Sequence, residues 1–375
     1  MKLKIKKNLL LKNLNNLSSA LSGKNLVPVY SAIKFDISKD DITLTATDGN
    51  ISIEIKIPSK KDELEISEKG SILIAGRTLI EIINKLDQED LKIEIIDDSK
   101  MLISTSNSQF ELNGFDKKDF PKLDFTLKEK CILINSNELK TMSSQIAFAT
   151  SNDESRPVLT GINFKITGNI LECNATDSYR LAQKTIKLDE NSIESSNFII
   201  PKRNLQEFTK IIENDDDEKI KMFVETNKVT FSYKNIIFVS RLINGNYPNV
   251  INLFKNETPI EITVKKINIY NVIDRASIFA TGVDKNGVLL NLKENSIEIK
   301  SSAEEIGKIE EKLEVKNIHK TKDFQIAFNS KFMMEALKSF SGEEITFFMS
   351  TPVQPIIIKN KEDESLIQLV QPLRI

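Results

Sequence analysis

The chain has 375 residues, which is too long for one hydrophobic core and predicts two or three domains. Hydrophobic residues make up 40% and charged residues 28%, a balance that excludes disordered and fibrous proteins and is typical of a globular one. No apolar run reaches the roughly 18 residues that span a bilayer, and the N-terminus lacks the apolar segment of a signal peptide, so we expect a cytoplasmic protein without a membrane partner.

The first block of the chain predicts a helix, a set of strands and a second helix. Leu11, Leu14 and Leu21 recur at helical spacing and indicate an amphipathic helix over Lys7–Leu21. From Ile33 to Ile57, apolar and polar residues alternate with the two-residue period of half-exposed strands. The remaining elements of this block are a second helix and four strands, expected at Arg77–Leu86 and at Ile72–Ala75, Leu91–Ile96, Met101–Thr105 and Gln109–Leu112.

The same order of elements returns twice. Ala46-Thr47-Asp48 recurs 129 residues later as Ala175-Thr176-Asp177, and Pro121 recurs 127 residues later as Pro248. A repeat of this length is a whole domain, and we expect three similar α+β domains, 1–125, 126–254 and 255–375, each with two helices on one face of an antiparallel sheet. The later helices are predicted at Asn137–Thr150, Lys202–Ile212, Lys266–Ala280 and Lys331–Phe340.

Charge is distributed unevenly between the predicted helices and the rest of the chain. Counted with Lys265 included in the fifth stretch, the six helical stretches carry thirteen Lys and Arg residues against five Asp and Glu residues, so they have a net charge of +8 and the remainder has −10. This separation favours a polyanionic partner that faces the helices. The alternative is that Lys is simply common on exposed helix faces.

No arrangement of residues in the sequence indicates catalysis, a metal or a cofactor. The single histidine, His319, lies in a polar linker, and none of the common hydrolase, zinc or phosphate-loop motifs occurs. Cys131 and Cys173 are far apart and are expected at half-buried strand positions. The apolar end of the chain, Leu369–Ile375, is either a docking surface or an edge strand. We therefore expect a protein without a catalytic site.

Five segments together resemble the bacterial DNA sliding clamp family, the beta subunit of DNA polymerase III. They are Ser155–Gly161, Ala175–Leu181, Ile200–Arg203, Ser240–Pro248 and Gln371–Ile375. The resemblance covers the full length and implies the DNA clamp fold, in which a head-to-tail homodimer closes into a ring with helices around a central hole. It further implies a processivity factor, an accessory subunit that encircles double-stranded DNA regardless of its sequence. A repeat-built adaptor that binds partners without encircling DNA is the alternative.

The resemblance also implies site residues. A hydrophobic pocket would bind short peptides of the replicative DNA polymerase, the clamp loader and repair proteins. Its wall would consist of Leu159, Thr176, Ser178, Tyr179, Arg180, Leu181, Pro248, Asn329, Phe332, Val353, Pro355, Val370, Pro372, Leu373 and Arg374, with Arg180 and Arg374 as polar anchors. The DNA-facing candidates are Lys7, Lys12, Lys24, Arg77, Lys85, Lys140, Lys202, Arg203, Lys210, Arg275, Lys331 and Lys338. The dimer contact would pair Phe110 and Leu112 with Ile278 and Phe279.

The sequence departs from the family pattern at four of these positions or their neighbours. The family often has Gly and His where Ser178 and Tyr179 stand, and a basic residue near Asn252. It often has Met where Gln371 stands, so we expect a more polar pocket here.

Overall fold

The structure is a computed structural model that describes residues 2–23, 27–96, 99–189, 195–214, 217–250, 253, 259–280, 287–315, 318–319 and 324–374. The chain divides into two compact units, one formed by Met1–Asn137 with Arg203–Leu242 and the other by Glu138–Lys202 with Ile243–Ile375. Each unit contains two antiparallel sheets and packed helices, so the α+β class is confirmed. Within the described ranges, no helix is long and apolar enough to cross a membrane.

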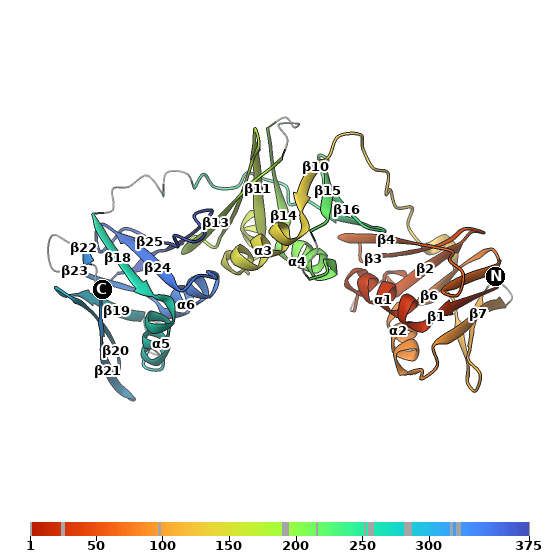
Figure 1. Cartoon of the computed structure of the whole chain (residues 1–375), viewed down its shortest axis with the longest axis horizontal. Helices are drawn as coiled ribbons and strands as arrows, with labels where there is room; N and C mark the ends of the chain where they lie inside the picture. Colours follow the sequence, from red (N-terminus) through yellow and green to blue (C-terminus); the bar gives the residue numbers. More distant parts are fainter. Residues whose placement is uncertain are drawn as a thin grey trace. The chain divides into compact units, whose positions relative to one another are not determined.

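The first unit is built on a five-stranded and an eight-stranded sheet (Figure 1). The smaller sheet has the order β5 (Leu64–Glu68), β1 (Lys2–Lys6), β7 (Asp90–Ile96), β8 (Lys100–Ser104) and β9 (Gln109–Asn113). The larger has the order β10 (Ile132–Asn135), β15 (Lys219–Val224), β16 (Lys228–Tyr233), β17 (Ile236–Arg241), β4 (Ile51–Pro58), β3 (Asp41–Thr47), β2 (Ala32–Ile37) and β6 (Gly70–Ala75). Because β17 pairs with β4, strands from two repeat copies share one sheet.

Three helices belong to this unit in whole or in large part. They are α1 (Lys7–Leu17), α2 (Gly76–Lys85) and α4 (Lys202–Ile211). Leu10, Leu14 and Leu17 are buried on α1, whereas Leu11 of the predicted apolar face is half-buried. Phe208 of α4 stacks on Phe231 with ring centroids 4.4 Å apart, and both side chains are fully buried in the core.

The second unit repeats this plan with a nine-stranded and a five-stranded sheet. The larger has the order β14 (Ser196–Pro201), β11 (Gly161–Thr167), β12 (Ile170–Thr176), β13 (Arg180–Lys187), β26 (Leu366–Val370), β25 (Ile356–Lys359), β24 (Glu344–Met349), β18 (Ile260–Lys265) and β22 (Ile318–His319). The smaller has the order β21 (Gly307–Glu314), β20 (Ser296–Ala303), β19 (Gly287–Leu292), β23 (Phe324–Asn329) and β27 (Pro372–Leu373). Here β13 and β26 join two repeat copies in the way that β17 and β4 do.

The helices of the second unit are α5 and α6, together with most of α3. Their bounds are α3 (Ser136–Ile146), α5 (Lys266–Ser277) and α6 (Ser330–Lys338). α5 and α6 pack side by side (Figure 1). Asn329 begins α6, because its side-chain Oδ1 accepts a hydrogen bond from the Phe332 backbone N–H at 3.1 Å.

Several local expectations are corrected by the structure. The predicted helices Lys7–Leu21 and Asn137–Thr150 end in 3₁₀ turns at Ser18–Ala20 and Ala147–Ala149. His319 does not lie in a linker, because it belongs to β22 and its backbone pairs with Glu261 of β18. Cys173 is fully buried in β12, whereas half-buried Cys131 precedes β10. Burial raises the pKa of the Cys173 thiol, as expected for an inert core residue.

Candidate partner-binding site and DNA-facing cations

A tight turn between β12 and β13 forms the centre of the predicted partner pocket. The Thr176 hydroxyl donates a hydrogen bond to the Arg180 carbonyl at 2.5 Å, and Asp177 Oδ1 accepts the backbone N–H groups of Tyr179 and Arg180. Ser178 has a φ of 81°, in the left-handed region that glycine adopts at least cost. Its repeat counterpart in the first copy is Gly49, with a φ of 89°. Ser178 therefore stands where the backbone favours glycine.

The C-terminal segment closes against this turn through backbone pairing. Arg180 pairs with Val370 across the β13–β26 seam, and the Gln371 N–H donates to the Tyr179 carbonyl at 2.8 Å. Two residues further on, β27 pairs with β23, with Leu373 opposite Ala327. The end of the chain is thus an edge strand of the smaller sheet. Its position beside Tyr179 also places it next to the predicted pocket.

The predicted pocket residues divide into a buried and an exposed set. Leu159, Thr176, Arg180, Leu181 and Val370 are buried. The half-buried members are Asn329, Phe332, Pro355, Pro372 and Leu373, and the exposed members are Ser178, Tyr179, Pro248, Val353 and Arg374. Tyr179 and Val353 are 65% and 74% exposed, so both leave apolar surface open to solvent.

Strand pairing and side-chain contacts bring most of the central members together, namely Thr176, Tyr179, Arg180, Leu181, Val370 and Phe332. Within the described part of the chain, no hydrogen bond or ion pair joins Pro248, Val353 or Pro355 to this group.

Arg180 is not free to anchor a ligand, contrary to the expectation from the sequence. Its side chain is 10% exposed, and its Nε lies 3.0 Å from Asp177 Oδ2. A second nitrogen forms an ion pair with Glu335, and a third donates to the Phe148 carbonyl at 2.8 Å. The guanidinium carbon also lies 4.4 Å from the centroid of the Phe332 ring. Arg180 therefore holds parts of the site together, whereas Arg374 is exposed, as is Arg156, which donates to the Ser178 hydroxyl oxygen at 2.8 Å.

A second polar link crosses the β13–β26 seam further along the strands. Lys184 Nζ lies 2.6 Å from Asp363 Oδ2, and both side chains are largely buried. Gln145 of α3 approaches the same carboxylate at 3.4 Å. Burial opposes ionisation, but hydrogen bonds from Lys184 and Ser365 outweigh it and hold the pKa of Asp363 below its usual range. The seam is therefore stabilised by a charge pair as well as by backbone pairing.

Sequence reasoning missed several residues of this region. Val250 packs with Leu181, Ile357 and Leu369 in a buried apolar cluster behind the seam. Glu335 and Phe148, which contact Arg180, were also missed. Glu335 lies three positions after Phe332 on the same helix, so helical spacing could have indicated it as a neighbour of the pocket.

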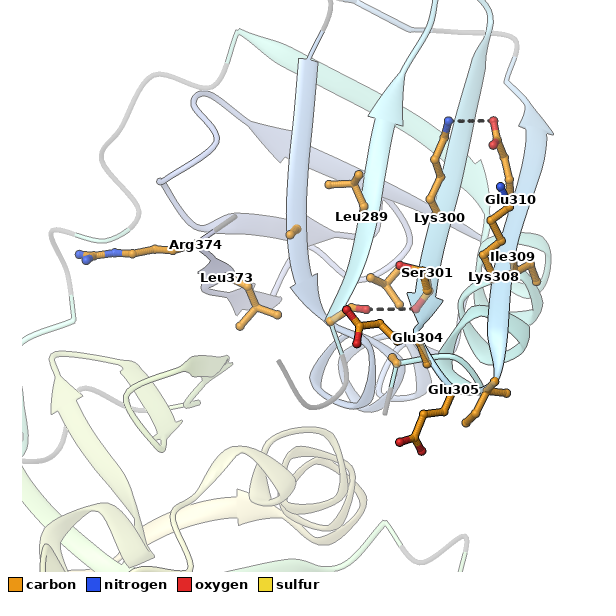
Figure 2. Close-up of a pocket in the computed structure, with 17 residues that line it drawn as sticks. Leu289, Lys300, Ser301, Glu304, Glu305, Lys308, Ile309, Glu310, Leu373 and Arg374 are labelled. Carbon is orange, nitrogen blue, oxygen red and sulfur yellow. Dashed lines mark hydrogen bonds and ion pairs between the residues drawn. The ribbon is translucent and has the colours of Figure 1, made fainter. Parts of the chain in front are cut away.

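A separate open cavity of about 930 Å³ lies on the smaller sheet of the second unit (Figure 2). Leu289, the Lys300–Glu310 ion pair and the turn containing Glu304 line it. It shares Leu373 and Arg374 with the predicted partner pocket, and Figure 2 shows Arg374 directed away from the other labelled side chains. The cavity adjoins Ala280, one residue beyond the dimer candidate Phe279.

Most of the DNA-facing candidates already have partners within the chain. Ion pairs join Lys12 to Glu213, Lys85 to Glu81, Lys210 to Glu207, Arg203 to Asp48 and Arg275 to Glu311. Lys7 donates to the carbonyls of Asn84 and Leu86 at the end of α2, and Lys338 lies over the Tyr270 ring. Lys140 also has a partner. Lys24 lies outside the described residues, as does Asn252.

Beyond these, Arg77, Lys202 and Lys331 have no carboxylate partner in the described ranges, and Arg77 donates a hydrogen bond to the Leu21 carbonyl at 3.5 Å. Arg77 and Lys331 are exposed on α2 and α6. Lys202 is half-buried at the start of α4, and burial, together with the nearby Arg180 guanidinium, lowers its pKa. Arg77 and Lys331 are therefore the strongest candidates for contact with a phosphate.

The dimer candidates lie on or beside strands that end their sheets in the described part of the chain. Phe110 and Leu112 are half-buried on β9, which ends the five-stranded sheet of the first unit. Ile278 is 61% exposed at the end of α5, and Phe279 follows it beside Gly307, the first residue of β21. β21 in turn ends the five-stranded sheet of the second unit.

Comparison with solved structures places this fold among DNA sliding clamps. The structure is similar to the DNA polymerase sliding clamp of Bacillus subtilis, with a TM-score of 0.95 and 35% identity over 100% of this chain and 99% of that one. It is equally similar to the DNA polymerase III beta chain of Streptococcus pneumoniae, with a TM-score of 0.95 and 30% identity over the whole of both chains.

The sequence agrees with this class. Family models of the N-terminal, central and C-terminal domains of the DNA polymerase III beta subunit match residues 1–124, 133–249 and 252–374. The beta sliding clamps of Staphylococcus epidermidis and Staphylococcus aureus are each 36% identical over 377 aligned positions, covering 100% of this chain and 99% of theirs. The chain belongs to the DNA polymerase III beta subunit family, the bacterial sliding clamps, and its function is that of a DNA polymerase processivity factor.

Proposed function

We propose that two copies of this chain close head to tail into a ring that encircles duplex DNA and tethers the replicative polymerase. The full-length match to sliding clamps at a TM-score of 0.95 carries this proposal. Each copy would consist of three clamp domains, 1–125, 126–254 and 255–375. The ring would act in the cytoplasm as an accessory subunit without a catalytic site, metal or cofactor of its own.

Two free sheet edges support the closure of the ring. β9 and β21 each end a five-stranded sheet, so each leaves one row of backbone groups without a strand partner in the described part of the chain. Phe110 and Leu112 on β9, and Ile309 and Leu313 on β21, alternate with exposed polar residues and stay half-buried. Exposed edges of this kind pair readily with another chain. We infer that β9 of one copy pairs with β21 of the next, which is a heterologous contact that closes a ring.

The charge pattern supports a loose grip on DNA. Affinity for duplex DNA rises with each phosphate that a cation neutralises. In this chain, Glu213, Glu81 and Glu207 already neutralise lysines on the helices. Retention would therefore depend on the closed ring, and contacts with few phosphates leave the ring free to slide.

The partner site would bind short hydrophobic peptides of the polymerase, the clamp loader and repair proteins. The exposed Tyr179 and Val353 offer apolar surface, and Arg374 offers a cation. The half-buried Gln371 adds an amide where the family often has a thioether. Deletion of 371–375 should abolish peptide binding, because it removes β27, while dimerisation through β9 and β21 should persist. Unchanged peptide affinity after this deletion would exclude the tail from the site.

The ring mechanism is tested by loading the protein onto nicked circular DNA and then linearising the DNA. We expect the protein to remain on the circle and to leave the linear molecule through its free ends. Blocking both ends with a bound protein is the control and should restore retention. A protein that stays on unblocked linear DNA would contradict topological binding and favour the adaptor alternative, in which partners bind without encirclement.

A further inference from the structure

Arg180 connects two repeat copies at the centre of the partner site. Asp177 belongs to the turn between β12 and β13 and Arg180 is the first residue of β13, whereas Phe332 and Glu335 belong to α6. The guanidinium contacts all three of these residues and the Phe148 carbonyl. Its position therefore fixes how the turn lies against the helix.

The two carboxylates that bind Arg180 orient its side chain relative to different elements. Asp177 lies three residues before Arg180, and its Oδ1 already accepts two backbone N–H groups at the turn between β12 and β13. It therefore orients Arg180 relative to its own strand. Glu335 approaches from α6, on the same helical face as Phe332. Of the two charge pairs, the one with Glu335 joins the guanidinium to α6, the helix that also carries the Phe332 ring.

We propose that Glu335 is a positioning residue of the partner-binding site, which holds the Arg180 guanidinium against the Phe332 ring and so fixes the apolar wall that α6 presents to a peptide. This inference rests on the proposed peptide-binding function. A guanidinium over an aromatic face is attracted by the ring and restricts its rotation. The Phe332 wall is thus ordered before a peptide binds. Binding therefore does not include the entropy cost of ordering this side chain.

Substitution of Glu335→Gln removes the negative charge and retains the shape of the side chain. Arg180 keeps Asp177 and the Phe148 carbonyl as partners, so its charge is not left buried alone and the fold should persist. Loss of one charge-assisted hydrogen bond in the wall should weaken binding of the probe peptide about tenfold. The probe is a fluorescein-labelled pentapeptide, Ser-Leu-Ser-Leu-Phe, whose affinity is measured by fluorescence anisotropy on the full-length dimer.

The chain offers a matched control at the same seam. Lys184 and Asp363 also form a buried ion pair between β13 and the segment before β26. Lys184 lies four residues from Arg180 along the strand, which corresponds to about 13 Å. Asp363→Asn should therefore weaken the seam without affecting the wall, and probe affinity should stay within about twofold. Thermal unfolding and light scattering of both variants confirm the fold and the dimer.

A double-substitution cycle separates positioning from general stability. If Glu335 acts through Arg180 on Phe332, Glu335→Gln should have no further effect on affinity in a Phe332→Leu background. Equal losses for Glu335→Gln and Asp363→Asn, or full additivity with Phe332→Leu, would overturn the inference while leaving the partner site intact. Failure of the unmodified protein to bind the probe would overturn the proposed partner site itself, and the inference with it.

Discussion

Arg203 Nη1 lies 2.9 Å from Asp48 Oδ2 in the first unit, in a relationship that Arg180 and Asp177 repeat in the second. Asp48 and Asp177 are counterparts in consecutive copies, and each uses Oδ1 to accept two backbone N–H groups of its own turn. The arginine comes from α4 in the first case and from the first residue of β13, directly after the turn, in the second. An arginine therefore binds the same turn in both copies. In the first copy this arginine is Arg203, which the sequence analysis predicted to contact DNA.

Arg203→Ala should destabilise the protein. The Asp48 side chain is 5% exposed, so loss of the arginine leaves a buried carboxylate with one partner fewer, at a cost of about 1–2 kcal/mol after allowance for the exposure of Arg203. Urea denaturation measures this cost. Lys331→Ala, at the repeat-related position of α6, is the exposed control and should stay close to the parent protein. Equal midpoints for the two variants would show that the Arg203 pair contributes nothing.

Stability should depend on pH through Asp363. Because its pKa is lower in the folded protein than in the unfolded chain, the ionised carboxylate stabilises the fold above about pH 4, and this contribution is lost as the pH falls through the folded pKa. Asp363→Asn should therefore be less stable than the parent by about 1 kcal/mol at pH 7. The difference should shrink toward zero at low pH. A difference that is constant between pH 7 and pH 3 would contradict the charge-pair assignment.

The exposed cations should determine the salt dependence of DNA binding. Arg77→Gln with Lys331→Gln should lower the slope of log affinity against log salt by about two, because each cation neutralises about one phosphate. The paired lysines Lys85 and Lys210 serve as controls and should contribute less when replaced by Gln, since Glu81 and Glu207 compete for them. Binding of short duplex DNA between low and moderate salt gives the slopes. A larger change for the paired lysines would reverse this ranking.

Dimerisation should depend on the edge of β9. Phe110→Asp places a charge in the proposed contact with β21 and should give a monomer with the chain mass of 42.5 kDa, whereas the parent should have twice that mass in light scattering at micromolar concentration. Ile170→Asp is a control at an apolar position outside the proposed contact, 47% exposed, and should leave the dimer unchanged. A dimeric Phe110→Asp variant would exclude this edge from the contact.

Periodicity in the sequence predicted most of the fold. The six helices lie within a few residues of their predicted positions, because each has a regular apolar face such as that formed by Leu10 and Leu14 in α1. Several strands were not predicted, among them β1, β5, β10, β14, β18 and β23. β13 was also missed, because Arg180, Gln183 and Lys184 interrupt its apolar pattern. These polar residues are buried only because β26 and α6 cover them. Burial of this kind depends on a contact between distant segments, which local periodicity does not contain.

Prediction of the site was less complete for the same reason. The resemblance indicated the pocket residues and the dimer contact, and their roles remain predictions. It could not indicate that Arg180 is committed to Glu335, because that contact joins residues that are 155 positions apart. Nor could the net charge of the helices show that Glu213, outside the predicted helices, binds Lys12. The boundaries of the three domains also remain predictions.

The sheets that continue from one repeat copy into the next have a consequence for how a ring would open. β17 meets β4, and β13 meets β26, as segments of one polypeptide, so the effective concentration of each partner strand is set by the tether and does not fall on dilution. A seam between β9 and β21 of separate chains has no such tether. Dilution, or a protein that competes for either strand, therefore acts on the seams between chains and leaves those within a chain closed.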